Sequence, residues 1–211
     1  MPYSSSKLSN QLLRHQQLLS QCQLCPDMQG PPVFGQVNVS KILLVGQAPG
    51  FKEIEVHKPF AWTAGKTLFG WFQQIGIEEE QFRKNVYMSA MCRCFPGKFK
   101  NGVRLKTGDR VPTKQELKNC NQWLDTEIKL LAPDLIIPVG KLAITHFVEF
   151  KKLTEVIGKQ HTVRLHDKNI SVIPLPHPSG ASTWPRTEPG KGLLQKALKL
   201  IASHNSCSKV F

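Results

Sequence analysis

The chain has 211 residues, 40% of them hydrophobic, which is enough to bury one sizeable core and predicts a single domain over 1–211. It opens without an apolar signal core and holds no stretch long enough to span a bilayer, which excludes a membrane protein and indicates a soluble, cytoplasmic one. Lysine and arginine total 28 against 15 acidic residues, and the resulting net charge of +13 favours nucleic acid as the partner.

The N-terminal segment 5–21 has leucines at helical spacing and predicts an amphipathic helix that leads to Cys22 and Cys25. Two thiolates separated by two residues can bind one metal centre from a single turn, and Cys94 and Cys120 would complete a set of four ligands. In a reducing compartment, six cysteines fit metal ligands plus spare thiols better than three disulfides. The spacing accepts either an iron–sulfur cluster or a structural zinc ion.

Short apolar runs bounded by glycine, proline or polar residues predict strands, and the segments between them predict helices. In the helix predicted over 112–131, Thr113 and Glu116 have the spacing of a capping box. The alternation predicts an α/β fold, a three-layer sandwich whose mostly parallel, four-stranded central sheet is flanked by helices. The predicted strands are 42–45, 86–91, 135–139 and 170–175, and the other predicted helices are 65–75, 141–150 and 190–204.

Glycine- and proline-rich loops follow the first and the last of these strands, with the sequences GQAPG at 46–50 and HPSG at 177–180. Ligands of open parallel sheets bind at the carboxyl ends of the strands, so both loops are candidates for a binding site. A third loop, 97–110, combines glycines with five basic residues and one acid. Phosphate contact is the expected role of its basic residues, Lys98, Lys100, Arg104, Lys106 and Arg110.

Together these features resemble the uracil-DNA glycosylase superfamily, and within it the iron–sulfur branches called family 4 and family 5. The resemblance runs from about Cys22 to the closing helix, and it rests on GxAPG at 46–50, PFxxxAG at 59–65, the four cysteines and His-Pro-Ser at 177–179. It implies the same α/β sandwich and an enzyme of base excision repair that hydrolyses the N-glycosidic bond of uracil in DNA and leaves an abasic site. DNA containing deaminated bases is the implied partner, and we expect a monomer associated with the nucleoid.

The resemblance also implies roles for single residues. The target base must be flipped out of the duplex, and Phe60 is implied to stack on the flipped uracil, with core packing as the alternative. His177 is implied to donate a hydrogen bond to uracil O2, where negative charge develops as the bond breaks. Ser179 either donates to a neighbouring DNA phosphate or serves as a turn hydroxyl. The other substrate-binding residues of the first motif are Gly46, Ala48, Pro49 and Gly50.

Three positions depart from the family pattern. Gln47 stands where family 4 has Glu, and Ala48 stands where the best-known branch has Asp. The residue that acts on the water is therefore open between Gln47, whose amide can position a water, and Glu53, which is otherwise a solvated loop acid. Ala90 stands where family 4 has a base-reading Asn, and in this it resembles family 5. Without that amide, activity is predicted to extend to hypoxanthine or xanthine.

In the resemblance, Cys22, Cys25, Cys94 and Cys120 match the ligands of a structural 4Fe-4S cluster, with zinc as the alternative. Cys92 competes with Cys94, which is preferred because a proline follows it closely. Two other functions stay open: a catalytically weak or inactive DNA-binding protein of the same fold, and a zinc-stabilised protein of other activity. The spare thiols would be Cys92 and Cys207, and the candidates for a side chain that wedges into the duplex are Trp184 and Arg186.

Overall fold

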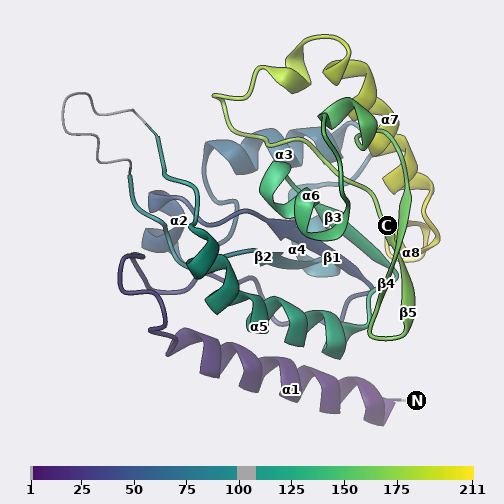
Figure 1. Ribbon diagram of the computed structural model, residues 1–211. Helices are drawn as coiled ribbons and strands as arrows, with labels where there is room; N and C mark the ends of the chain where they lie inside the picture. The colour runs from purple at the N-terminus through teal and green to yellow at the C-terminus, as the bar shows by residue number, and fades with distance from the viewer. Residues whose placement is uncertain (1, 99–107) are drawn as a thin grey trace, which may run out of the picture.

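A five-stranded sheet in the order β2-β1-β3-β5-β4 forms the centre of this computed structural model, which describes residues 2–98 and 108–211. Strands β2, β1, β3 and β5 run parallel, and β4 pairs antiparallel with β5 at one edge (Figure 1). The predicted α/β fold with a mostly parallel sheet is therefore confirmed. The strands are β1 (Ile42–Gly46), β2 (Tyr87–Ala90), β3 (Leu135–Pro138), β4 (His161–Leu165) and β5 (Lys168–Val172).

The inner strands β1 and β3 are buried along their whole length. Continuous apolar runs of this kind are typical of parallel strands that are covered on both faces. Successive residues of a strand point to opposite faces, so Ile42 and Leu44 pack in one hydrophobic cluster while Leu43 and Val45 pack in another. The sheet is the middle layer of three.

Helices cover both faces of the sheet (Figure 1). On one face α1 (Pro2–Ser20) lies beside α5 (Lys114–Leu131), and Leu12 joins Leu124 and Ile128 in the same cluster. Helices α3, α4 and α7 pack on the other face. Within the described residues, no helix is both long and apolar enough to cross a bilayer. The remaining helices are α2 (Phe51–Val56), α3 (Thr63–Gln73), α4 (Glu79–Asn85), α6 (Lys141–Phe147), α7 (Gly190–Ser203) and α8 (Asn205–Ser208), with 3-10 turns at Leu153–Glu155 and Trp184–Arg186.

The start of α5 confirms the predicted capping box. The Thr113 hydroxyl accepts a hydrogen bond from the Glu116 backbone N–H at 3.2 Å, and the Glu116 carboxylate accepts one from the Thr113 N–H at 2.7 Å. Arg110 donates two further hydrogen bonds to that carboxylate, at 2.7 and 2.6 Å, which lowers the pKa of Glu116 to about 2. The end of the loop before α5 is thus fastened to the first turn of the helix.

The fifth strand and two short helices, α2 and α4, differ from the predicted elements. Strand β4 alternates between half-buried and exposed residues, so it lacks the apolar run that marks the inner strands. His166 and Asp167 form the turn between β4 and β5 with φ of 46° and 61°, a geometry more often occupied by Asn-Gly or Asp-Gly. The helix predicted over 141–150 ends at Phe147, because Val148 takes an extended conformation.

Candidate functional site

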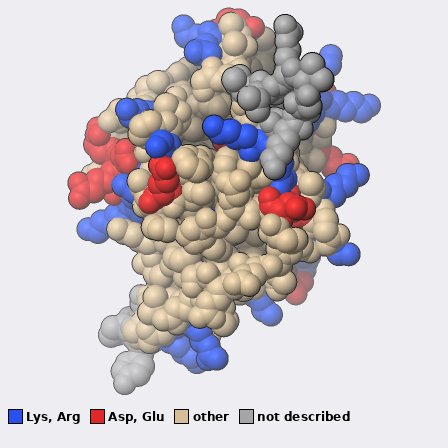
Figure 2. Space-filling model, turned by 90° about the vertical axis from the view of Figure 1, so that its left-hand side faces the viewer, with Lys and Arg blue, Asp and Glu red and all other residues tan. Residues whose placement is uncertain are grey.

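The loops that follow β1 and β5 meet in one pocket of 590 Å³, which we call the motif pocket. This volume lies within the range of about 300–1,000 Å³ that is typical of small-ligand sites. Helix α2, next to the pocket, lies on the left in Figure 1, the side that faces the viewer in Figure 2, where basic and acidic side chains surround a largely uncharged centre. Every predicted catalytic or substrate-binding residue lines the pocket: Gly46, Gln47, Ala48, Pro49, Gly50, Glu53, Phe60, Ala90, His177 and Ser179.

The imidazole of His177 is held in one orientation inside the motif pocket. Its Nδ1 accepts a hydrogen bond from the Ser179 backbone N–H at 3.2 Å, which leaves the Nε2–H as the donor of the neutral ring. Burial lowers the pKa of His177, so this neutral form is favoured near pH 7. Gly140 packs directly against the ring, since a Cβ at that position would lie 2.7 Å from His177 Cδ2.

The aromatic ring of Phe60 packs over the backbone of Gly46, because a Cβ on Gly46 would lie 3.0 Å from the ring. The backbone of Phe60 has φ of 53°, a conformation that non-glycine residues adopt only where the surroundings impose it. Arg83 supplies part of that constraint by donating to the Pro59 carbonyl at 2.9 Å and to the Phe60 carbonyl at 3.0 Å. The ring is therefore fixed at the pocket wall.

Glu53 fastens the two motif loops to each other. Its carboxylate accepts hydrogen bonds from the backbone N–H groups of Gly50, at 2.6 Å, and of Phe60 and Ala61. Burial raises the pKa of Glu53, although these hydrogen bonds and the charge of Arg83 oppose the increase. The carboxylate is thus occupied by backbone donors and not simply solvated.

Three residues that line the motif pocket, Gln47, Ala48 and Ala90, carry no ionisable side chain. Among the described residues, none hydrogen-bonds the side-chain amide of Gln47, which leaves that amide free to hold a water. Ala48 and Ala90 line the pocket with methyl groups only. The backbone carbonyl of Ala90 accepts a hydrogen bond from Arg93 Nε at 3.0 Å.

Only part of the predicted basic loop can be placed, since Lys100, Arg104 and Lys106 lie outside the described residues. Lys98 is exposed and lines the motif pocket, where its charge opposes the rise that burial causes in the pKa of Asp109, whereas Arg110 also lines the pocket but is paired with Glu116. Sequence reasoning missed Asp109, which reaches the pocket with its Oδ2 3.4 Å from where a Gly50 Cβ would lie. The signal in the sequence that could have identified Asp109 is that it is the one acid in the otherwise basic loop 97–110.

The two predicted wedge candidates lie differently. Trp184 packs against the hydrophobic cluster on the α7 face of the sheet, and Gly190 approaches its ring closely. Arg186 is exposed and donates a hydrogen bond to the Gly180 carbonyl at 2.9 Å, in the loop that carries His177. Of the two, only Arg186 is available to a partner without unpacking the core.

A second cavity, of 480 Å³, is bordered by all four predicted metal ligands: Cys22, Cys25, Cys94 and Cys120. We call it the cysteine cavity. Cys92 does not line it; its buried thiol hydrogen-bonds to Cys120 and lowers the pKa of Cys120 to about 7. Burial raises the pKa of Cys94 to about 12. In the part of the chain that the structure describes, no three metal-binding side chains are grouped tightly enough to hold a single metal ion. Four thiols around a roomy cavity fit a multinuclear cluster better than one zinc ion.

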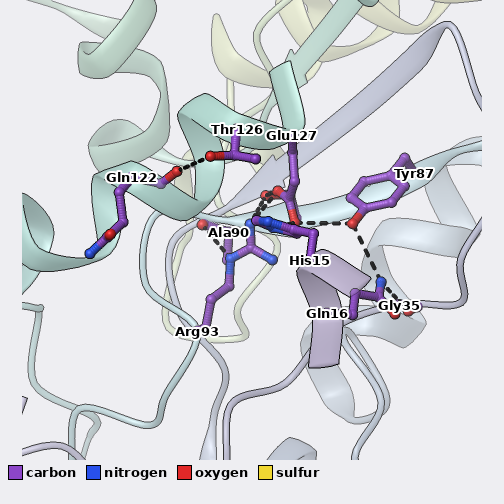
Figure 3. Close-up of polar contacts among 10 residues, drawn as sticks. His15, Gln16, Gly35, Tyr87, Ala90, Arg93, Gln122, Thr126 and Glu127 are labelled. Atoms are coloured by element: carbon purple, nitrogen blue, oxygen red, sulfur yellow. Dashed lines mark hydrogen bonds and ion pairs between the residues drawn. The ribbon is translucent and has the colours of Figure 1, made fainter. Parts of the chain in front are cut away.

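A buried polar network is centred on Glu127 (Figure 3). Its carboxylate accepts hydrogen bonds from the Tyr87 hydroxyl at 3.0 Å and the Ser89 hydroxyl at 2.8 Å, and it forms an ion pair with Arg93. Burial alone would raise the pKa of Glu127, but the charges of Arg93 and His15 and the hydrogen bonds that both donate together outweigh burial and lower it. Because Ser89 lines the motif pocket and Arg93 the cysteine cavity, the network joins the walls of both.

Comparison with known proteins gives one matching family model, described as the uracil DNA glycosylase superfamily, over residues 32–201. The matched range contains both motif loops together with Cys94 and Cys120, and it begins after Cys22 and Cys25.

Several curated relatives share the name type-4 uracil-DNA glycosylase. The protein from Sulfurisphaera tokodaii is 28% identical over 148 residues, covering 67% of this chain and 61% of that protein. The protein from Thermotoga maritima is 31% identical over 129 residues, covering 60% of each chain. The protein from Pyrobaculum aerophilum is 25% identical over 194 residues, covering 88% of this chain and 90% of that protein. The chain thus spans about three fifths of the length of the first two relatives and most of the third.

Proposed function

The chain belongs to the uracil-DNA glycosylase superfamily, and from that membership and the motif pocket we propose that it is a DNA repair glycosylase that hydrolyses the N-glycosidic bond of uracil in DNA. The observation that carries the proposal is the meeting of the two motif loops, with Phe60 and His177 both held rigidly on one pocket. The relatives named type-4 uracil-DNA glycosylase support the same reaction. The proposal includes a monomer that acts on the nucleoid in the cytoplasm.

Recognition would begin with flipping of the damaged nucleotide into the motif pocket. Unstacking a base costs a few kcal/mol, which stacking on Phe60 and polar contacts offset. Since the Phe60 ring is fixed from the backbone side by Arg83 and Glu53, little conformational entropy is lost when the base stacks on it. A base bound there would be excluded from bulk water on one face.

Bond cleavage would depend chiefly on His177. As the glycosidic bond breaks, negative charge develops on uracil O2, and a preoriented N–H donor stabilises that charge. The Nε2–H of His177 is such a donor, because its Nδ1 is already occupied by the Ser179 N–H. The neutral ring needs no proton transfer to act. Gln47 would hold the water that attacks the sugar, in place of the carboxylate of family 4.

The lesion range follows from Ala90. An amide at this position would reject bases that leave it without a hydrogen-bond partner. The methyl group of Ala90 imposes no such penalty, so other bases are not rejected there. We therefore extend the proposal to hypoxanthine and xanthine. Comparing release of uracil, hypoxanthine and xanthine by the wild type and by Ala90→Asn tests it: the variant should become more selective for uracil, and a wild type already strict for uracil would refute the broader range.

A structural 4Fe-4S cluster is the second part of the proposal, with Cys22, Cys25, Cys94 and Cys120 as ligands. Their shared cavity and the position of Cys92 behind it support this set over one that contains Cys92. A cluster there would crosslink the segment after α1, the loop after β2 and helix α5, and it supplies no electron to a hydrolysis. Iron and sulfide analysis of the purified protein, with zinc measured in the same sample, separates the cluster from the zinc alternative.

The decisive experiment measures strand scission after alkali treatment of a labelled oligonucleotide that contains one uracil. We expect cleavage at the uracil, and a rate about 100-fold lower for His177→Asn, the size of effect seen when one charge-stabilising donor is removed. His166→Asn, on the β4–β5 turn, is the matched control and should react like the wild type.

One alternative has a specific observation in its favour. Gln47 and Ala48 leave the first motif without the acid found in active branches, as expected of a DNA-binding protein with little or no catalysis. Binding of uracil-containing DNA without any base release, by protein with its metal intact, would establish that alternative and overturn the enzyme.

A further inference from the structure

Two large aromatic side chains stand exposed at the mouth of the motif pocket. Phe51 is 44% exposed at the start of α2, and Trp62 is 54% exposed just before α3. Both line the pocket. Among the described residues, the other large aromatic exposed to a similar extent is Phe211, at the C-terminal end of the chain. Single exposed apolar residues are common, but two exposed rings on the wall of one pocket form a cluster of the kind that marks a binding surface.

The rings are held in place rather than loose. Phe51 makes an edge-to-face contact with the buried Phe95, with ring centroids 6.0 Å apart. The ammonium of Lys52 lies 5.8 Å from the Phe51 ring and 6.0 Å from the Trp62 ring. The Lys52 ammonium, which also forms an exposed ion pair with Glu55 at 2.8 Å, thus lies near both rings beside the pocket.

An unpaired stretch of DNA matches this arrangement. Its bases offer flat faces for stacking, and its phosphates offer negative charge to a lysine between the stacked bases. In a duplex the base faces are covered by their neighbours, so rings of this kind can stack only on bases that are unpaired. The net charge of +13 and the basic Lys98 on the same pocket favour a polyanion over an apolar protein surface.

We propose that Phe51 and Trp62 form a stacking platform for an unpaired base next to the nucleotide in the motif pocket. Lys52 would then contact the phosphate that links this base to that nucleotide. This rests on the proposed function for the identity of the pocket's occupant. The platform makes single-stranded DNA, or a strand already separated from its partner, the preferred substrate. It also fixes which neighbouring base is stacked when the target nucleotide is in the pocket, because Phe51 and Trp62 line that same pocket.

The test is a binding cycle between protein and DNA variants. The probe is a single strand with one 2′-fluoro-deoxyuridine, whose fluorine prevents cleavage of the glycosidic bond. In a series of such strands, an abasic sugar replaces one neighbouring nucleotide at a time. We expect removal of one particular neighbouring base to weaken binding to the wild type about tenfold, the effect of losing one stacked base. Trp62→Leu should bind the intact strand about tenfold more weakly and show no further loss when that base is missing.

Conservative and distant substitutions serve as controls. Trp62→Phe keeps a ring and should retain most of the affinity, whereas Phe51→Leu should behave like Trp62→Leu. Leu18→Ala, an exposed apolar side chain on α1, should bind like the wild type. Binding of the intact strand should also quench the fluorescence of Trp62, an effect that Trp62→Phe removes.

The result that overturns the platform is equal binding of the intact strand by wild type, Trp62→Leu and Phe51→Leu, or a loss that is the same whichever base is absent. This outcome is separable from failure of the proposed function. Uracil release without base-specific coupling would remove the platform and leave the enzyme. Base-specific coupling without uracil release from an unmodified strand would keep the platform and remove the enzyme.

Discussion

At the scale of single residues, the contact between Gly140 and His177 constrains the motif pocket closely. Gly140 has φ of 87°, which disfavours any side chain, and an added Cβ would lie 2.7 Å from the imidazole. The glycine therefore sets where the His177 donor points. His177 is visible in the sequence as part of a motif, but the glycine that packs against it follows a different strand and gives no local signal.

Gly140→Ala should displace the imidazole and slow base release by about tenfold or more, since a donor moved from its place loses much of its effect on the transition state. Single-turnover release of uracil measures the rate. Gly76→Ala is the matched control, because Gly76 also has a positive φ, 79°, but nothing lies within 4 Å of its added Cβ. Equal rates for the two variants would show that the His177 position tolerates the methyl group.

The pH dependence of base release should also reflect His177. Burial lowers its pKa, so the neutral donor persists below the ordinary value of about 6.5. We expect a rate that stays level from pH 8 down to about 6.5 and falls only at more acidic pH, because a proton on Nδ1 removes the acceptor of the Ser179 N–H and the ring loses its fixed orientation. A rate that rises on acidification would instead assign the activity to the imidazolium.

Rate is a better readout of this titration than stability. A histidine that is buried in its neutral form lowers the stability of the folded protein as pH falls through about 6.5, the pKa of histidine in the unfolded chain. The unfolded state then binds more protons than the folded state. His146 and His204 have pKa values lowered by burial as well, so they would contribute to the same stability loss. Base release isolates the residue in the motif pocket.

At the scale of elements, two short helices hold the Phe60 loop from opposite sides. Glu53 in α2 accepts a hydrogen bond from the backbone N–H of Phe60, and Arg83 in α4 donates one to the Phe60 carbonyl. Both helices were absent from the predicted elements, since runs of only six or seven residues are too short to show helical periodicity. Glu53 was predicted as a site residue, and its observed contacts show that it also holds the loop.

Arg83→Lys should release the Phe60 loop while keeping the positive charge. One ammonium cannot reproduce the fork that reaches the Pro59 and Phe60 carbonyls together with Glu79, so the αL conformation of Phe60 loses its support. We expect KM for a uracil-containing strand to rise about tenfold with a smaller change in kcat. Arg164→Lys, an exposed ion pair in β4, is the control and should leave KM unchanged. A fall in kcat alone would contradict a role in base stacking.

At the scale of the whole molecule, the parts predictable from the sequence are those with a local pattern. Parallel strands appear as apolar runs, the capping box of α5 appears as Thr113 and Glu116, and the motif loops follow strand ends. What the sequence does not reveal depends on contacts between distant segments. Asp109 reaches Gly50, Arg83 reaches Phe60, and Glu127 reaches Arg93 only in the folded chain.

The ion pair of Arg93 and Glu127 joins α5 to the segment between β2 and the cysteine cavity, and His15 brings α1 to the same carboxylate at 3.3 Å. Removing one partner leaves a charge unpaired in the interior, at a cost of about 3–5 kcal/mol, whereas replacing both by apolar residues of similar volume costs far less. We therefore expect Arg93→Met and Glu127→Leu each to lower Tm by about 10 °C.

The double variant should recover most of that loss, because neither charge is then left alone in the interior. Thermal unfolding of both single variants and of the double variant measures the coupling. Asp134→Asn, which breaks the more exposed pair with Lys168, should cost no more than about 1 kcal/mol. If the double variant is no more stable than the single variants, the two residues do not act as a pair, and the hydrogen bonds from Tyr87 and Ser89 to Glu127 would then hold the network together. Recovery would instead identify the ion pair as the link between the helical layer and the walls of both cavities.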